Sequence, residues 1–194
     1  GYKVRLLLSM LGITAERVDV DFHPGAEHRG DAFLALNPLG ELPVLVHGER
    51  VLRDSKAIMV YLATLHDTDG HWWPVHDAAR IADTVQWLAV ADELTGSAGR
   101  ARLIEGFFHD GDLEALQARA RELLRILDRH LWFAERSGAD WLVAGTRPTL
   151  ADIACFPYVA LSEEGGVMHE DCPAVRRWCD RVGRLPGFVL MPGV

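Results

Sequence analysis

The sequence is poor in cysteine, which limits the classes of protein that it can represent. There are three cysteines in 194 residues, and they form neither a Cys-x-x-Cys pair nor a zinc-ligand spacing. They are Cys155, Cys172 and Cys179. A sparse, odd number of thiols is untypical of a secreted disulfide scaffold and fits a reducing compartment, so we expect a cytoplasmic protein.

A metal-binding pattern is also missing. The chain has nine histidines, of which His66, His71 and His76 recur every five residues. That spacing scatters the rings around a helix, whereas a His-x-x-x-His pair places two ligands on one face. We therefore expect no metal site.

Long apolar runs and an excess of positive charge are two further absences. No run approaches the roughly 20 residues that cross a bilayer, and no secretory segment opens the chain. Lysine and arginine number 20 against 28 acidic residues, a net charge of −8, and they are spread along the chain. Nucleic-acid binding requires a concentrated basic face. We expect neither a membrane nor a nucleic-acid partner.

The first 66 residues alternate in the type of element that their pattern predicts. The expected elements are, in order, a helix over 2–11 ended by Gly12, a strand over 17–22, a short helix over 32–36, strands over 42–46 and 50–53 joined as a hairpin, and a helix over 55–66. This order describes an α/β domain over residues 1–66 that lacks only a first strand. We infer that the natural protein supplies this strand before residue 1.

The remaining chain has a different character. Residues 67–76 are rich in turn formers and predict a linker, and residues 77–194 predict an all-helical domain. Helices are expected over 78–96, resuming near 100, then after Asp112, after Thr149, and from Pro173 to about 183. Thr149 and Asp152 have the spacing of a capping box, which we assign to folding.

Leu42 and Pro43 form the first candidate binding feature. Pro43 precedes an apolar strand although it cannot donate a ladder hydrogen bond. A cis bond before Pro43 would turn the backbone outward and present the Leu42 N–H and C=O to a ligand. A peptide-like ligand can pair with such an exposed edge. The alternative is that Pro43 only terminates an edge strand.

Asp54 and Ser55 form the second feature, at a strand-to-helix junction. The helix N-terminus favours a ligand carboxylate, the Ser55 hydroxyl adds a donor, and Asp54 can pair with an ammonium group. The alternative is a simple helix cap. Both features together, about eleven residues apart in one α/β layout, favour a ligand that has a peptide backbone, a carboxylate and an amine. Glutathione is such a ligand.

The helix expected over 78–96 adds weaker candidates. Two apolar stripes on it indicate two packing partners, consistent with a domain core plus a subunit interface. Asp92 continues one stripe and either faces the ligand cleft, bonding an ammonium group, or is solvated where the stripe ends. Four aromatic residues could line an apolar pocket for an electrophile, although such residues more often belong to the core. They are Trp87, Phe107, Phe108 and Tyr158.

These motifs resemble those of a known family. Residues 33–45, with N-P-L-G-E-L-P-V-L at their end, and D-S-x-A-I at 54–58 are similar to the glutathione-binding core of cytosolic, bacterial-type glutathione S-transferases. Residues 149–153 resemble that family's helix-six signature, and residues 172–178 with 185–188 resemble its closing helix. The resemblance covers essentially the whole chain.

The resemblance implies a fold, a co-substrate and partners. The fold would be a thioredoxin-like α/β N-terminal domain followed by an all-α C-terminal domain, usually as a homodimer. Leu42, beside a cis-Pro43, would bond the cysteinyl backbone of glutathione, and Asp54 and Ser55 would hold the γ-glutamyl end. The second substrate would be a small hydrophobic electrophile.

The group that activates the thiol is the part of the site that the resemblance leaves open. A free thiol is only slightly ionised at pH 7, so an enzyme of this family needs a group that stabilises the thiolate. We expect this group at or just before Gly1, with Tyr2 as a weak candidate. Two functions remain open: a transferase, which can include peroxidase or isomerase activity, and a non-catalytic glutathione-binding or protein-interaction module.

Overall fold

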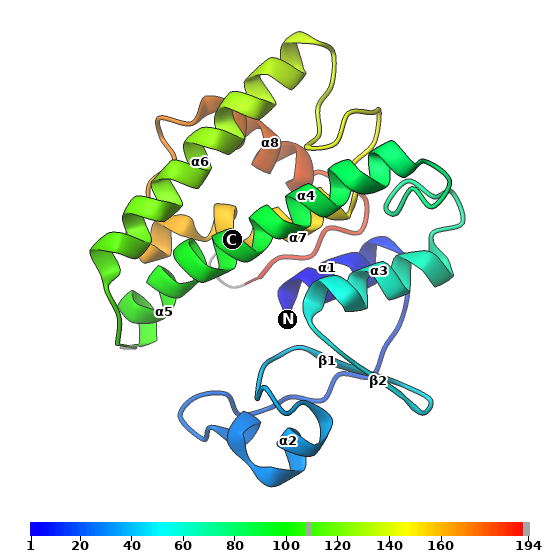
Figure 1. Cartoon of the computed structure of the whole chain (residues 1–194), viewed down its shortest axis with the longest axis vertical. Coiled ribbons are helices and arrows are strands. Elements are labelled where there is room, and N and C mark those ends of the chain that lie inside the picture. Colours follow the sequence, from blue (N-terminus) through cyan, green and yellow to red (C-terminus); the bar gives the residue numbers. More distant parts are fainter. Residues whose placement is uncertain (108–109, 192–194) are drawn as a thin grey trace.

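The computed structural model describes residues 1–107 and 110–191. Its elements fall into two groups (Figure 1). A small antiparallel hairpin lies with three helices of the N-terminal part, and the remaining helices pack together on the other side of α1 and α3. The main apolar core is continuous across both groups, since buried side chains of α1 and α3 belong to one cluster with those of the other group and both helices lie against α7.

The N-terminal group follows the expected order closely. Its elements are α1 (Tyr2–Met10), the 3₁₀ turn η1 (Glu27–Arg29), α2 (Asp31–Leu36), β1 (Val44–His47), β2 (Arg50–Arg53) and α3 (Ser55–His66). The predicted Gly12 stop is confirmed. Gly12 has φ +67°, its N–H donates to the Ser9 carbonyl at 3.1 Å, and the Ile13 N–H donates to the Leu8 carbonyl at 2.9 Å. These two backbone hydrogen bonds are the pattern of a helix that ends at a glycine.

The strand expected over residues 17–22 is wrong for the structure described here. β1 and β2 pair only with each other in the described residues, in the register Val44↔Arg53. Residues 17–22 are irregular, because a strand is defined by a ladder and no partner strand lies beside them. Val18, expected on the apolar face, is 77% exposed, and Arg17 instead pairs locally with Asp19.

The C-terminal group consists, in its described residues, of α-helices with two short turns of other helical types. It contains α4 (Ala78–Leu94), a π turn η2 (Thr95–Gly99), α5 (Arg100–Phe107), α6 (Leu113–Arg136), α7 (Leu150–Ala160), the 3₁₀ turn η3 (Ser162–Gly165) and α8 (Pro173–Gly183). The predicted caps are confirmed, since Asp77 accepts from the Arg80 N–H and Asp112 from the Ala115 N–H, both at 3.0 Å. None of the described helices has both the length and the apolar character needed to cross a bilayer.

The capping box at the start of α7 is confirmed and extends further than its local pattern indicated. The Thr149 N–H donates to Asp152 Oδ2 at 2.8 Å. Oδ1 of Asp152 also accepts from the Leu142 N–H at 3.1 Å and from Trp178 Nε1 at 2.8 Å. Burial raises the pKa of Asp152, and these N–H donors act in the opposite direction. The carboxylate therefore joins α7 to α8 and to the preceding loop.

Candidate functional site

A cleft of about 500 Å³ lies where the two groups of elements meet. The N-terminal group supplies Gly1, Tyr2, Lys3, Phe22, Glu41, Leu42, Pro43, Asp54 and Ser55. The helical group and the C-terminal segment supply Asp92, Thr95, Arg102, Pro157, Tyr158, Leu161 and Met191. The structure thus brings together seven residues that were proposed from the sequence: Tyr2, Leu42, Pro43, Asp54, Ser55, Asp92 and Tyr158.

The Leu42–Pro43 segment has the geometry expected of a peptide-binding edge. The bond between the two residues is cis, and the β1 ladder starts only at Val44. Within the described residues, neither the N–H nor the C=O of Leu42 has a hydrogen-bond partner. The start of α1 lies against this segment, because a Cβ atom on Gly1 would be 3.0 Å from Cδ of Pro43. A ligand backbone at Leu42 would therefore lie next to the N-terminus of α1.

Asp54 is both a helix cap and a cleft residue. Its Oδ1 accepts from the N–H groups of Lys56 and Ala57 at 2.9 and 3.0 Å, which caps α3. Its backbone has φ +75° and ψ +124°, a conformation that non-glycine residues rarely adopt. The cap uses Oδ1 only. Oδ2 lies 3.6 Å from Nζ of Lys56 and can still accept a hydrogen bond from a ligand. The cap is therefore compatible with a ligand contact at Asp54.

Asp92 lines the same cleft and forms an ion pair with Lys56 that the sequence did not predict. Lys56 on α3 donates from Nζ to Oδ2 of Asp92 on α4, and it also lies beside Asp54. Two carboxylates thus surround one ammonium, and this small cluster carries a net charge of −1. Because its net charge is negative, such a cluster still favours an incoming ammonium group.

Tyr2 lines the cleft, but its hydroxyl is already engaged. It donates to the carbonyl of Val189 at 2.7 Å, and burial raises the pKa of Tyr2 to about 12. To stabilise a thiolate, this hydroxyl would have to give up its bond to the C-terminal segment. Its geometry fits a structural role.

A Tyr2→Phe variant is expected to lose about 0.5–1.5 kcal/mol of its free energy of unfolding, since one hydrogen bond to Val189 disappears. Its glutathione affinity is expected to stay unchanged. Urea unfolding followed by circular dichroism measures the first quantity, and calorimetric titration the second. Strong loss of thiolate formation in this variant would return Tyr2 to the catalytic candidates.

Of the four aromatic candidates for the substrate pocket, the structure places Tyr158 in the cleft and Trp87 outside it. Tyr158 lines the cleft, and its ring lies against Gly99, where an added Cβ would be 2.7 Å from Cε1. Trp87 does not line the cleft: its ring packs against His130 at a centroid distance of 4.6 Å. Phe107 ends α5, but its side chain and the whole of Phe108 lie outside the described residues.

Several cleft residues were not foreseen. Lys3 and Arg102 bring positive charge to it, and Phe22 brings apolar surface. The sequence does contain an indication of Lys3: it is the one charged residue among the buried residues of α1. The others are Tyr2, Val4, Leu6 and Leu7. Arg102 follows the π turn. No local sequence pattern predicts the extra residue of such a turn, so the direction of the Arg102 side chain could not be predicted.

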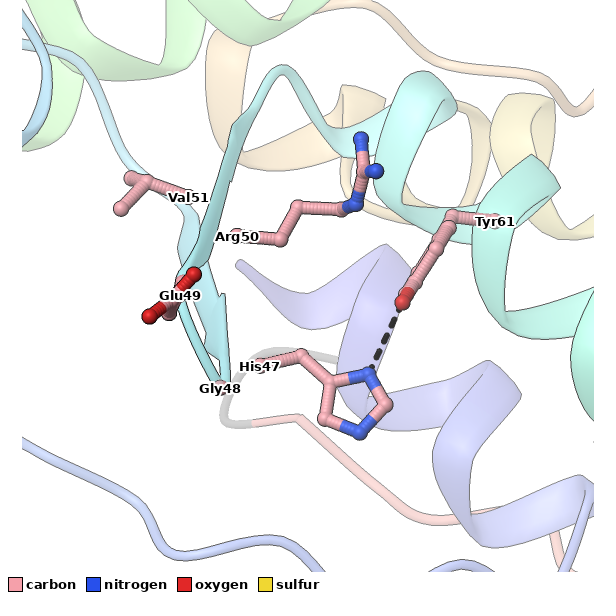
Figure 2. A pocket seen from close by; sticks show the side chains of 6 residues that line it. All are labelled: His47, Gly48, Glu49, Arg50, Val51 and Tyr61. Carbon is pink, nitrogen blue, oxygen red and sulfur yellow. Dashed lines mark hydrogen bonds between the residues drawn. The ribbon is translucent and has the colours of Figure 1, made fainter.

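A second hollow lies on the hairpin, as Figure 2 shows. It has a volume of about 630 Å³ and is lined by His47, Gly48, Glu49, Arg50, Val51 and Tyr61. Nδ1 of His47 and the Tyr61 hydroxyl are hydrogen-bonded at 2.9 Å, so these two polar groups satisfy each other. This hollow contains none of the candidate residues and lies open on one face of the hairpin, so the cleft is the better candidate site.

Possible metal ligands and cysteine thiols are the remaining reactive groups to be placed. In the two described segments, no three histidine, cysteine or acidic side chains are grouped to hold a metal ion. Burial raises the pKa of the Cys155 thiol, and it raises that of Cys179 to about 12. Thiols with raised pKa values are weak nucleophiles at neutral pH.

Comparison with known proteins agrees with this arrangement. The family model for the N-terminal domain of glutathione S-transferases matches residues 1–64, and the model for a C-terminal domain matches residues 110–181. The chain belongs to the glutathione S-transferase family. The N-terminal group therefore corresponds to the family's thioredoxin-like domain, and the other helices correspond to its all-α domain.

Individual relatives extend over most of the chain. Glutathione S-transferase theta-2 of Homo sapiens is 31% identical over 190 residues, 92% of this chain and 74% of that protein. A solved glutathione S-transferase from Xanthobacter autotrophicus Py2 is 31% identical, with a TM-score of 0.85 over 99% of this chain and 91% of the other. Ure2p in complex with glutathione has a TM-score of 0.82 at 23% identity, over 96% and 85% of the two chains, and shows the likeness of fold.

Proposed function

We propose that this protein is a glutathione transferase that activates the thiol of glutathione for attack on a small hydrophobic electrophile. One observation carries the proposal. A single cleft combines an unpaired peptide edge at Leu42, an acid–hydroxyl pair at Asp54 and Ser55, and the N-terminus of α1. The relatives named glutathione S-transferase support the same reaction class.

Each part of glutathione has a counterpart in the cleft. The cysteinyl backbone would pair with the N–H and C=O of Leu42, as an added strand pairs with a sheet edge. The γ-glutamyl carboxylate would bind the hydroxyl and N–H of Ser55 at the N-terminus of α3, where the helix dipole favours an anion. The γ-glutamyl ammonium would lie beside Asp54 and Asp92, within the cluster that has net negative charge.

The thiol would then lie near the first turn of α1. A cysteinyl residue held at Leu42 is adjacent to Pro43, which contacts the start of that helix. The positive end of a helix lowers the pKa of a nearby thiol and so raises the fraction of thiolate. The apolar side chains of Pro157, Tyr158 and Leu161 offer a surface for the electrophile across the cleft.

A homodimer is the expected assembly. Three exposed apolar side chains lie on elements that the core covers on their other side: Val51 on β2, Leu65 on α3 and Val85 on α4. Exposed apolar side chains would leave water if a second chain covered them. We propose that these elements meet their copies in a second chain.

The function is tested by turnover of a chromogenic aryl halide with glutathione, together with the ultraviolet difference spectrum of the bound thiolate. In that reaction the thiolate forms a carbon–sulfur bond and the halide ion leaves. A transferase gives both signals. Glutathione binding without a thiolate spectrum or turnover would instead establish a non-catalytic glutathione-binding module.

A Ser55→Ala variant is expected to bind glutathione about 1–2 kcal/mol more weakly, roughly tenfold, because one hydrogen bond to a charged group is lost. Calorimetric titration with glutathione measures the change. Ser137→Ala is a suitable control, since Ser137 follows the end of α6, its hydroxyl donates to the Phe133 carbonyl, and it does not line the cleft. Equal affinity of the Ser55 variant and the unmodified protein would remove Ser55 from the site.

A further inference from the structure

Lys3 is a buried cation in the wall of the cleft. Only 7% of its surface is exposed, although lysine rarely becomes so buried. Its Nζ donates to the Thr95 hydroxyl at 3.2 Å and lies 5.2 Å from the ring centroid of Tyr158. Both partners belong to the helical group, so the lysine connects α1 to that group in the wall of the cleft.

The positive charge of Lys3 is not balanced by a direct contact. No carboxylate among residues 1–107 and 110–191 forms an ion pair with it, whereas Lys56 is paired with Asp54 and Asp92, and Arg102 with Glu164. An ammonium group has three N–H donors, and the Thr95 hydroxyl takes one of them. Burial lowers the pKa of Lys3, and the more distant carboxylates of Asp92 and Asp54 act in the opposite direction without offsetting it. A buried charge of this kind is stabilised by a counter-charge.

The cleft offers a place for such a counter-charge beside Thr95 and Tyr158, which the helical group contributes. Leu42, Asp54 and Ser55 belong to the N-terminal group, whereas Thr95 and Tyr158 frame the Lys3 ammonium from the helical group. The ring of Tyr158 is held in place by the close approach of Gly99. An aromatic body lying along this ring would bring a substituent at its end to Nζ.

We propose that the second substrate is an aromatic or similarly apolar electrophile that carries a carboxylate, and that Lys3 binds this carboxylate. The proposal rests on the proposed function and narrows its substrate class. Lys3 then selects among electrophiles by charge, while the apolar walls of the cleft accept the rest of the molecule.

The test compares two probes of nearly equal shape, para-nitrobenzoate and para-nitrobenzamide, titrated calorimetrically into the protein with and without glutathione. The unmodified protein is expected to bind the carboxylate at least about tenfold more tightly than the amide, the range of a hydrogen bond to a charged group. Lys3→Met, which keeps the length and apolar stem, is expected to abolish this preference. Arg5→Met removes a positive charge from the exposed side of α1, outside the cleft, and is expected to retain it.

Three results would overturn the proposal: no binding of the carboxylate, no preference for it over the amide, or a preference that survives in Lys3→Met. In the third case, a simultaneous loss of glutathione affinity in Lys3→Met would assign the Lys3 charge to the thiolate. Failure of the proposed function is read separately, as absence of the thiolate spectrum and of turnover, because the probe titrations without glutathione report on Lys3 by themselves.

Discussion

An Asp152→Ala variant is expected to lose about 3–5 kcal/mol of its free energy of unfolding. The carboxylate is fully buried and accepts from the N–H groups of Leu142 and Thr149 and from Nε1 of Trp178. Alanine would leave these three donors buried without an acceptor, and each unsatisfied donor costs about 1–3 kcal/mol. Partial rearrangement of the loop before α7 keeps the sum below three full penalties.

Asp152→Asn provides a matched comparison. An asparagine keeps one oxygen for Leu142 and Trp178 and places its NH₂ group opposite the Thr149 N–H, so only one donor is lost. It is expected to lose about 1–3 kcal/mol. Urea unfolding followed by both tryptophan fluorescence and circular dichroism measures the two variants. If alanine proved no more damaging than asparagine, Asp152 would be an ordinary cap and would not join α7 to α8.

An Asp54→Asn variant is expected to weaken glutathione binding by about 1.5–3 kcal/mol, a factor of roughly 10 to 100. A neutral amide cannot form an ion pair with the γ-glutamyl ammonium, and Asp92 alone would be neutralised by Lys56. The fold is expected to persist, because asparagine keeps the oxygen that caps α3 and tolerates a positive φ such as the +75° seen here.

A second aspartate cap supplies the control for Asp54. Asp112→Asn changes the same functional group at the start of α6, where Asp112 caps the helix and does not line the cleft. Calorimetric titration with glutathione is expected to show unchanged affinity in this variant. A similar loss in both variants would mean that the effect arises from general destabilisation, and the ammonium contact of Asp54 would be rejected.

The sequence predicts most helices because their ends depend on local chemistry. Gly12, Asp77, Asp112 and Thr149 each act through the few residues around them, and each was placed correctly. The alternation over residues 17–22 was no weaker as a local signal, yet it forms no strand here. A strand depends on hydrogen bonds to a neighbouring strand, which a local pattern does not contain.

The candidate site shows the same division. The positions of Leu42, Asp54 and Ser55 in the cleft follow from short motifs, where turn and cap chemistry fix the backbone. The long-range partners could not be predicted in this way. The ion pair of Lys56 with Asp92 spans 36 residues and the bond of Lys3 to Thr95 spans 92, so each depends on how two elements pack.

The first turn of α1 has a consequence for recombining members of this family. Tyr2 is tied to a carbonyl 187 residues later, and its neighbour Lys3 to a hydroxyl at the end of α4. A chimera that joins the N-terminal group to the helical group of another member of the family would replace the partners of both residues at once. The acceptor at Val189 is a backbone carbonyl, which any residue supplies, whereas the acceptor at Thr95 is a side-chain hydroxyl. Residues 3 and 95 would therefore have to be exchanged as a pair, whatever residue stands at position 189.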